Sequence, residues 1–200
     1  MDDAKSIKNI TRFDRDGRSV NYTNCVREYT DEEFDEHFEG CQNFTQMRSS
    51  VIDAALKIEN ALTVVILHFL VKDDYSRHGL LRALIFETES CSFMQKRKML
   101  SAMFEMVGDE ITCLPKSDAK ELRRDINAII LIRDMMAHGV IYYDGASESF
   151  VIRYFRGKQT ESPLADKLYD EFLVLCNRVD NRLTTLNQFF RENRVDYSPW

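Results

Sequence analysis

The most regular pattern in the chain is an apolar stripe between residues 44 and 71. Its members recur at intervals of three and four residues, which places them on one face of a helix. They are Phe44, Met47, Val51, Ala54, Ile58, Leu62, Val65 and Phe69. The spacing therefore predicts a long amphipathic helix over residues 44–71 whose apolar face packs against a core.

Two further helices are predicted between residues 80 and 104. Apolar positions favour a short helix around residues 80–86, after a polar loop. The segment 93–104 has the same helical spacing, and we expect Lys96 and the two basic residues that follow it to form a basic outer face.

The helix that precedes Gly139 carries both a start and a stop signal. Asp118 and Glu121, three residues apart, form a capping pair. Apolar residues then continue at helical intervals up to His138, and glycine at position 139 is typical of a helix C-cap. We therefore expect a helix from about residue 118 to residue 138.

The pattern changes period after this helix. Residues 140–155 form two β-rich runs around Asp144-Gly145, which predicts a β-hairpin. Ser162-Pro163 then supplies an N-cap and a first-turn proline, which predicts the start of a last helix. Its apolar face comprises Leu164, Leu168, Phe172, Leu175, Val179, Leu183, Leu186 and Phe190.

The N-terminal 41 residues are more polar and less regular. Asp16-Gly17 indicates a turn between short β-favouring stretches. Thr30 with Glu33 forms a capping box that predicts a short helix. We therefore expect a cap segment with a short helix over residues 1–41, followed by one helical domain over residues 42–200. The expected fold class is all-α, an up-and-down helical bundle with a β-hairpin inserted before the long C-terminal helix.

Composition narrows the classes of function. The chain has 200 residues, enough for one domain, and a net charge of −6 from 27 Lys and Arg against 33 Asp and Glu. This balance excludes a protein that coats nucleic acid through a general positive field, although one local basic site remains compatible with it. The N-terminus carries no signal-peptide pattern, and the apolar run from Ala61 to Val71 is too short to span a bilayer. We expect a cytoplasmic protein with no membrane partner.

Metal and cofactor motifs are absent from the sequence. The five cysteines are scattered and never spaced as C-x-x-C, and no glycine-rich phosphate loop or dinucleotide fingerprint occurs. We expect no cofactor and no metal site. Among the four histidines, His68 is expected to be a partly buried residue with one hydrogen bond, and His37 and His78 are expected to be solvated.

His138 differs because of the residues that precede it. Positions 132–139 read Ile-Arg-Asp-Met-Met-Ala-His-Gly, at the end of an apolar helix. Here the chain resembles the HEPN superfamily, whose signature is an arginine, usually a polar residue, a few more residues and a histidine. The resemblance in overall pattern covers about residues 42–190, and the motif itself covers eight residues. It implies a dimeric helical bundle, in many members a metal-independent ribonuclease of toxin or antiphage defence systems. The group of mannitol-repressor-like regulators is also similar around the motif.

The residues at the motif suit RNA cleavage. His138 can exchange protons near neutral pH, and the Arg133 guanidinium suits phosphate oxygens. Five residues correspond to about 140° of rotation on an ideal helix, so Arg133 and His138 do not share a face. Asp134 does share a face with His138, which gives it an orienting role. A dimer relaxes the constraint, because one subunit's arginine can meet the other's histidine.

A structural explanation of the same residues stays open. A histidine in the last helical turn is favoured by the helix dipole, glycine after it is an ordinary C-cap, and Arg133 can pair with Asp134. The sequence nevertheless favours an endoribonuclease of HEPN type with Arg133, His138 and Asp134 as its site residues. Its expected partners are an RNA substrate, a second copy of the chain, and a cognate antitoxin or regulatory protein. The alternative is a non-catalytic HEPN-like regulatory or interaction module.

Overall fold

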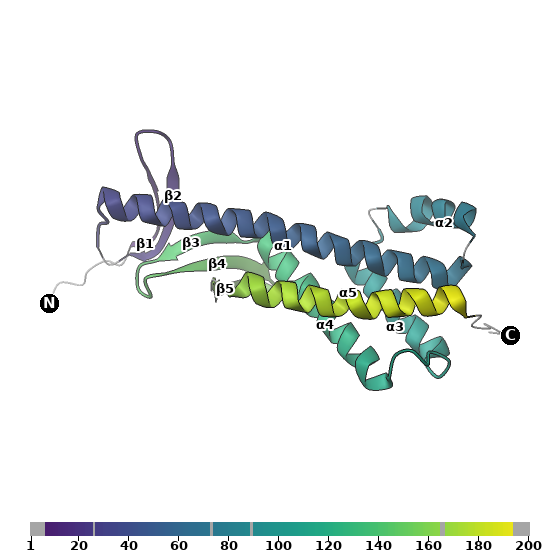
Figure 1. Cartoon of the computed structure of the whole chain (residues 1–200). Coiled ribbons are helices and arrows are strands. Elements are labelled where there is room, and N and C mark those ends of the chain that lie inside the picture. The colour runs from purple at the N-terminus through teal and green to yellow at the C-terminus, as the bar shows by residue number, and fades with distance from the viewer. Residues whose placement is uncertain (1–6, 26, 73, 89, 165–166, 194–200) are drawn as a thin grey trace. The chain divides into compact units, whose positions relative to one another are not determined.

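The chain folds as a mixed α/β protein (Figure 1). The computed structural model describes residues 7–25, 27–72, 74–88, 90–164 and 167–193. Within these ranges it forms five α-helices, one π-helical turn and a five-stranded sheet. The expected all-α bundle with a single hairpin is therefore wrong, because strands on both sides of that hairpin extend it into a sheet.

Contacts along the chain divide it into two compact units. The first unit comprises Met1–Ile52 and Arg133–Asp170, and the second comprises Asp53–Ile132 and Glu171–Trp200. Helices α1 (Asp31–Val71), α4 (Lys116–His138) and α5 (Leu168–Glu192) each contribute residues to both units. A division of the chain at residue 41 stays a prediction.

The first unit contains the sheet. Its strands are β1 (Ile7–Phe13), β2 (Ser19–Cys25), β3 (Val140–Asp144), β4 (Ser149–Arg156) and β5 (Lys158–Pro163), and they lie in that order. All neighbours pair antiparallel except β2 and β3, which pair in parallel through Tyr22–Tyr143 and Thr23–Asp144. The predicted hairpin at Asp144-Gly145 is confirmed as β3 and β4.

The β1–β2 turn explains the Asp16-Gly17 signal. The Asp14 carboxylate accepts hydrogen bonds from the backbone N–H groups of Asp16 (3.0 Å) and Arg18 (2.8 Å), and Gly17 has φ of +79°. The sequence indicated the turn and β-favouring stretches on both sides of it, but not their pairing as strands of a sheet. Their pattern is mostly polar, and Val20 and Tyr22 are buried only because α1 covers them.

Helix α1 is longer than the predicted helix over residues 44–71. The capping box at its start is confirmed, because the N–H of Glu33 donates to the Thr30 hydroxyl (3.2 Å) and the N–H of Thr30 donates to the Glu33 carboxylate (2.8 Å). The expected short helix is the first part of α1, which continues through Gly40. At Gly40 a Cβ atom would lie 2.4 Å from Cζ of Phe150, so the glycine allows β4 to approach the helix.

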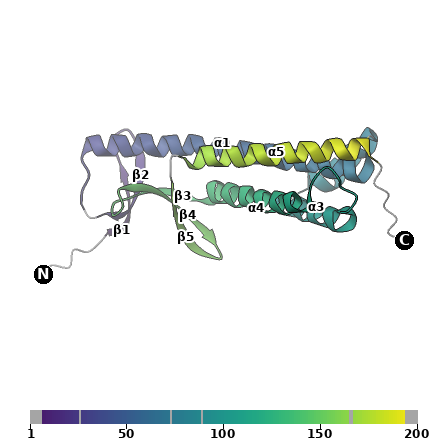
Figure 2. The same ribbon diagram turned by 60° about the horizontal axis from the view of Figure 1, so that its bottom comes forward.

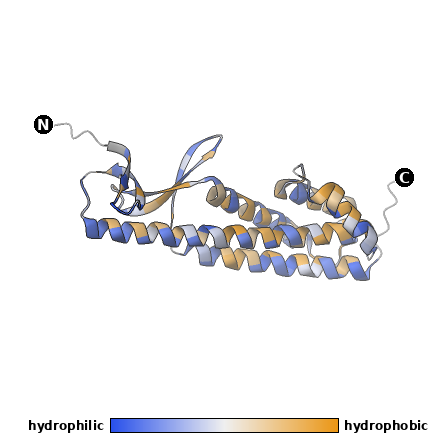
Figure 3. Cartoon of the chain, turned by 90° about the horizontal axis from the view of Figure 1, so that it is seen from above, coloured by the Kyte–Doolittle hydropathy of each residue, from blue (hydrophilic) through white to orange (hydrophobic). Residues whose placement is uncertain are grey.

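The second unit is helical. It contains the second part of α1, α2 (Tyr75–Leu81), the π-helical turn η1 (Arg82–Phe86), α3 (Phe93–Val107), most of α4 and most of α5. Helix α5 runs beside the second part of α1 (Figures 1 and 2), where the rings of Phe69 and Phe190 lie 5.2 Å apart. Figure 3 shows apolar residues along the helices, and the core includes Leu62, Val65, Leu100, Leu122, Ile126, Val179 and Leu183.

The predicted start of the last helix is wrong. Ser162 and Pro163 close strand β5, where Pro163 is paired with Val151, and α5 begins at Leu168. Proline lacks the N–H that a second neighbour would need, and β5 is an edge strand where that donor is dispensable. The local Ser-Pro signal was therefore overridden by strand pairing.

Buried charges correct the expected basic face of α3. Lys96 is 6% exposed, and its ammonium group lies 2.8 Å from the Glu59 carboxylate. The buried acid Asp125 accepts hydrogen bonds from Arg178 (2.8 Å) and Arg182 (3.3 Å). Both sets of charges lie within the second unit and connect its helices.

In the described part of the chain, α1 is long and apolar enough over an 18-residue window to cross a membrane, and half of that window is buried within the protein. The core helix of a soluble protein has the same length and composition. The cytoplasmic location stays a prediction.

Candidate active site at the end of helix α4

Arg133, Asp134 and His138 all lie in the last part of α4, in the first unit. The helix ends at His138 and strand β3 begins at Val140, so Gly139 alone joins them. The N–H of Gly139 donates to the carbonyl of Met135 (2.8 Å) and closes the last turn. This short connection fixes the position of His138 just before the central strand β3 of the sheet.

Glycine occupies position 139 for a different reason from the predicted C-cap. Its φ is not positive, unlike that of Gly17 or Gly157. A Cβ atom at Gly139 would lie 2.4 Å from Cγ1 of Ile152 and 2.5 Å from the carbonyl oxygen of Met135. The glycine is therefore required by close packing of β4 against the helix end.

Arg133 and Asp134 are paired with each other. Nη1 of Arg133 lies 3.2 Å from Oδ1 of Asp134, and the two side chains are 27% and 47% exposed. Neither side chain forms a hydrogen bond with His138 within the described residues. Arg133 and Asp134 are both accessible to a ligand. Within one subunit, the guanidinium of Arg133 is not hydrogen-bonded to the imidazole of His138.

The His138 side chain is exposed and has no hydrogen-bond or ion-pair partner in the described part of the chain. The other three histidines are all engaged. Nδ1 of His37 lies 3.3 Å from the Tyr22 hydroxyl, the Nδ1–H of His68 donates to the carbonyl of Val64 (3.1 Å), and the Nε2–H of His78 donates to the carbonyl of Lys72. His138 is thus the histidine with both nitrogens available for chemistry.

Two of the expectations about the other histidines are settled by their burial. His68 is 7% exposed with a hydrogen bond to the backbone, as predicted. His37 is also 7% exposed, so the expectation that it is solvated is wrong. A sequence signal for this existed, because Phe34, His37, Cys41 and Phe44 continue the apolar stripe at intervals of three and four residues.

Arg48 of α1 adds a second cation at the end of α4. Its Nη2 donates to the carbonyl of Gly139 (2.8 Å), while its Nε is buried without a hydrogen-bond partner among the described residues. A cation at this position complements the partial negative charge of a helix C-terminus. Sequence analysis did not identify Arg48, because it lies 91 positions before its partner and belongs to no local motif.

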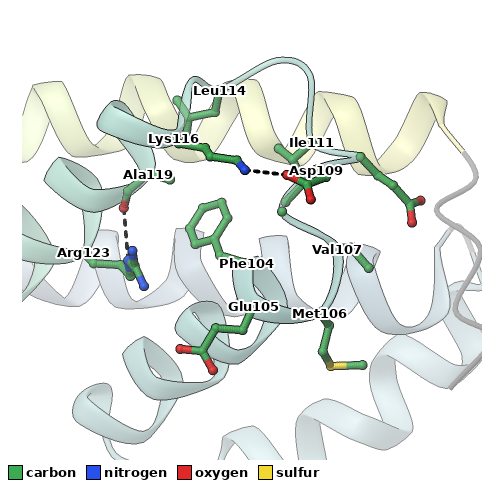
Figure 4. A pocket seen from close by; sticks show the side chains of 12 residues that line it. Phe104, Glu105, Met106, Val107, Asp109, Ile111, Leu114, Lys116, Ala119 and Arg123 are labelled. Atoms are coloured by element: carbon green, nitrogen blue, oxygen red, sulfur yellow. Dashed lines mark hydrogen bonds and ion pairs between the residues drawn. The ribbon is translucent and has the colours of Figure 1, made fainter.

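A cavity of the second unit does not contain the motif. It has a volume of about 510 Å³ and lies between the end of α3 and the start of α4 (Figure 4). Phe104 points toward its centre, and the charged groups at its rim bind within the protein: Lys116 to Asp109 (2.6 Å) and Arg123 to the carbonyl of Ala119 (3.3 Å). Across the described ranges, no group of three or more His, Cys, Asp or Glu side chains is arranged to hold a metal ion.

Comparison of the chain with protein-family models, with curated proteins and with solved structures finds no match.

Proposed function

We propose that the protein is a metal-independent endoribonuclease whose site is formed by His138, Arg133 and Asp134. The observation that supports this proposal most is the exposed, unpartnered ring of His138, five residues after the partly exposed Arg133 on the same helix. The resemblance of residues 132–139 to the HEPN signature gives the pair its expected chemistry.

The reaction is transesterification by the RNA itself. His138 accepts the proton of the 2′-hydroxyl, which attacks the adjacent phosphorus, and the P–O5′ bond breaks as its oxygen takes up a proton. Arg133 stabilises the negative charge on the phosphate oxygens. Asp134 holds the guanidinium in the absence of RNA, and the phosphate competes with it for Arg133.

Two copies of the chain complete the site in this proposal. Arg133 and His138 project about 140° apart on the helix, so a phosphate that contacts both is reached most easily when they come from different subunits. A homodimer would place two such arginine–histidine pairs at one cleft. An antitoxin or regulatory protein would act by covering that cleft.

RNA cleavage by mixed variants tests the proposal. We expect wild-type protein to cleave RNA in the presence of a chelator, and Arg133→Ala and His138→Ala each to lose at least about 100-fold in rate. After the two variants are mixed and allowed to exchange subunits, activity should return, because one composite site then regains both residues. Arg124→Ala is the matched control, since Arg124 also lies on α4 beside an aspartate, Asp125 (3.6 Å). Equal cleavage by all variants would refute the site.

A second candidate is a non-catalytic regulatory or interaction module of mannitol-repressor-like type. It is favoured by the ion pair between Arg133 and Asp134, which offsets the positive charge, and by two exposed aromatic side chains in the strands, Phe13 (67%) and Phe155 (77%). This candidate predicts that no RNA is cleaved and that Phe155→Ser weakens binding of a protein partner.

A further inference from the structure

A cavity of about 330 Å³ lies in the first unit, between the start of α1 and the β3–β4 hairpin. Helix α1 contributes Glu33, Glu36 and His37, which lie three and four residues apart on one face. The hairpin contributes Tyr143 and Phe150 from its strands and Glu148 from its turn. The volume lies at the lower end of that of small-molecule sites, about 300–1,000 Å³, and suits a ligand of amino-acid size.

One wall of the cavity is aromatic. The His37 ring stacks on Tyr143 with centroids 3.6 Å apart and planes 24° from parallel. Phe150 meets Tyr143 edge to face at 5.4 Å. Aromatic faces carry partial negative charge and attract ammonium and guanidinium groups.

The charged residues of the cavity are predominantly acidic. Arg27 donates to both carboxylate oxygens of Glu33, at 2.6 and 2.9 Å, and holds the pKa of that carboxyl to about 2. Glu36 and Glu148 are exposed and have no hydrogen-bond or ion-pair partner within the described residues. One cation therefore faces three carboxylates, and the cavity attracts positive charge.

His37 supplies a hydrogen-bond donor that lacks an acceptor. Burial lowers its pKa, so the imidazole is neutral and carries one N–H. The Tyr22 hydroxyl is fully buried and has no other acceptor among the described residues, so it donates to Nδ1 of His37 and leaves the ring proton on Nε2. The 7% exposed ring lines the cavity, and its Nε2–H has no partner in the described part of the chain.

We propose that this cavity binds an organic cation, a guanidinium or primary ammonium group joined to a hydrogen-bond acceptor such as a carbonyl. The cation lies against the aromatic wall beside Glu36 and Glu148, and the acceptor meets the His37 Nε2–H. An arginine or lysine residue, free as its amide or presented by a peptide, has this chemistry. The site is independent of RNA cleavage.

Calorimetric titration with Nα-acetylarginine amide tests the site, with Nα-acetylcitrulline amide as the neutral probe of the same shape. We expect the arginine compound to bind and the citrulline compound not to bind. Glu36→Gln and Glu148→Gln should each raise Kd about fivefold, the size of one charge pair at about 4 Å in water-like surroundings. Glu39→Gln is the control, because it removes the same charge from an exposed position of α1 outside the cavity.

A second titration, with acetyl-Gly-Arg-Gly-amide, distinguishes a free small molecule from an arginine on a partner chain. Binding of the amide alone supports a free small molecule, and binding of the peptide supports an arginine on a partner chain. Equal affinities for the acetylated arginine and citrulline amides, or equal effects of the three glutamine variants, would overturn the proposal. Circular dichroism of each variant confirms that it is folded before binding is compared.

Discussion

Substitution of Gly139 by alanine tests how the end of α4 is fixed to the sheet. The new Cβ would lie 2.4 and 2.5 Å from two carbons of Ile152 and 2.5 Å from the carbonyl oxygen of Met135, where carbon contacts normally need about 3.5–4.0 Å. The Ile152 side chain can move, but the Met135 oxygen belongs to the helix backbone. Overpacking of this kind costs about 3 kcal/mol, and alanine recovers about 1 kcal/mol of backbone entropy, so we expect a net loss of about 2 kcal/mol.

Urea unfolding followed by circular dichroism measures this change. Gly79→Ala is the matched control, because Gly79 lies inside α2 with no atom within 4 Å of its would-be Cβ, and we expect it to stabilise the protein by about 0.5–1 kcal/mol. The double variant with Gly139→Ala and Ile152→Ala should lose about 1 kcal/mol less free energy of unfolding than the sum of the losses in the two single variants. If the free energy of unfolding of Gly139→Ala lies within about 0.5 kcal/mol of the wild-type value, the packing argument is refuted.

Two further predictions concern buried polar groups. Asp125→Ala removes the buried carboxylate to which Arg178 and Arg182 donate hydrogen bonds, and in urea titrations it should lower the free energy of unfolding by about 3 kcal/mol. Asp180 is exposed, so Asp180→Ala should change the free energy of unfolding little, and equal effects of the two variants would contradict the role of the network. Burial lowers the pKa of His37 and of His68 below 6.5, so the unfolded chain binds protons first as the pH falls, and stability present above pH 6.5 should decline as the pH falls below 6.5. Thermal unfolding at several pH values should show a smaller loss of stability in His37→Phe than in wild type. The same pH dependence in both proteins would contradict the role of His37.

The sequence predicted the helices well and the sheet poorly, for identifiable physical reasons. The stripe from Phe44 to Phe69 is dictated by the helical period, and the capping box at Thr30 is a local hydrogen-bond pattern, so both could be recognised without tertiary information. Strands β1, β2 and β5 are mostly polar, and their pairing into one sheet depends on contacts such as that of β2 with β3, which is distant in the sequence. The edge position of Pro163 depends on Val151, which local signals do not contain.

The residues of the candidate site could be predicted from the sequence, but the contacts around them could not. Arg133, Asp134 and His138 follow from the spacing at the end of a helix, and their exposure agrees with the accessible site that they require. The contact of Arg48 with Gly139 joins positions 91 apart, and sequence spacing carries no information on it. Lys96 was misplaced for the same reason, since its acidic partner Glu59 lies on another helix.

The chemistry of the RNA ends tests the proposed reaction most directly. Cleavage by the 2′-hydroxyl with His138 as proton acceptor predicts fragments with 2′,3′-cyclic phosphate and 5′-hydroxyl ends in the presence of a chelator, and loss of those fragments in His138→Ala. Fragments with 3′-hydroxyl and 5′-phosphate ends, or cleavage that continues in His138→Ala, would contradict the proposed site.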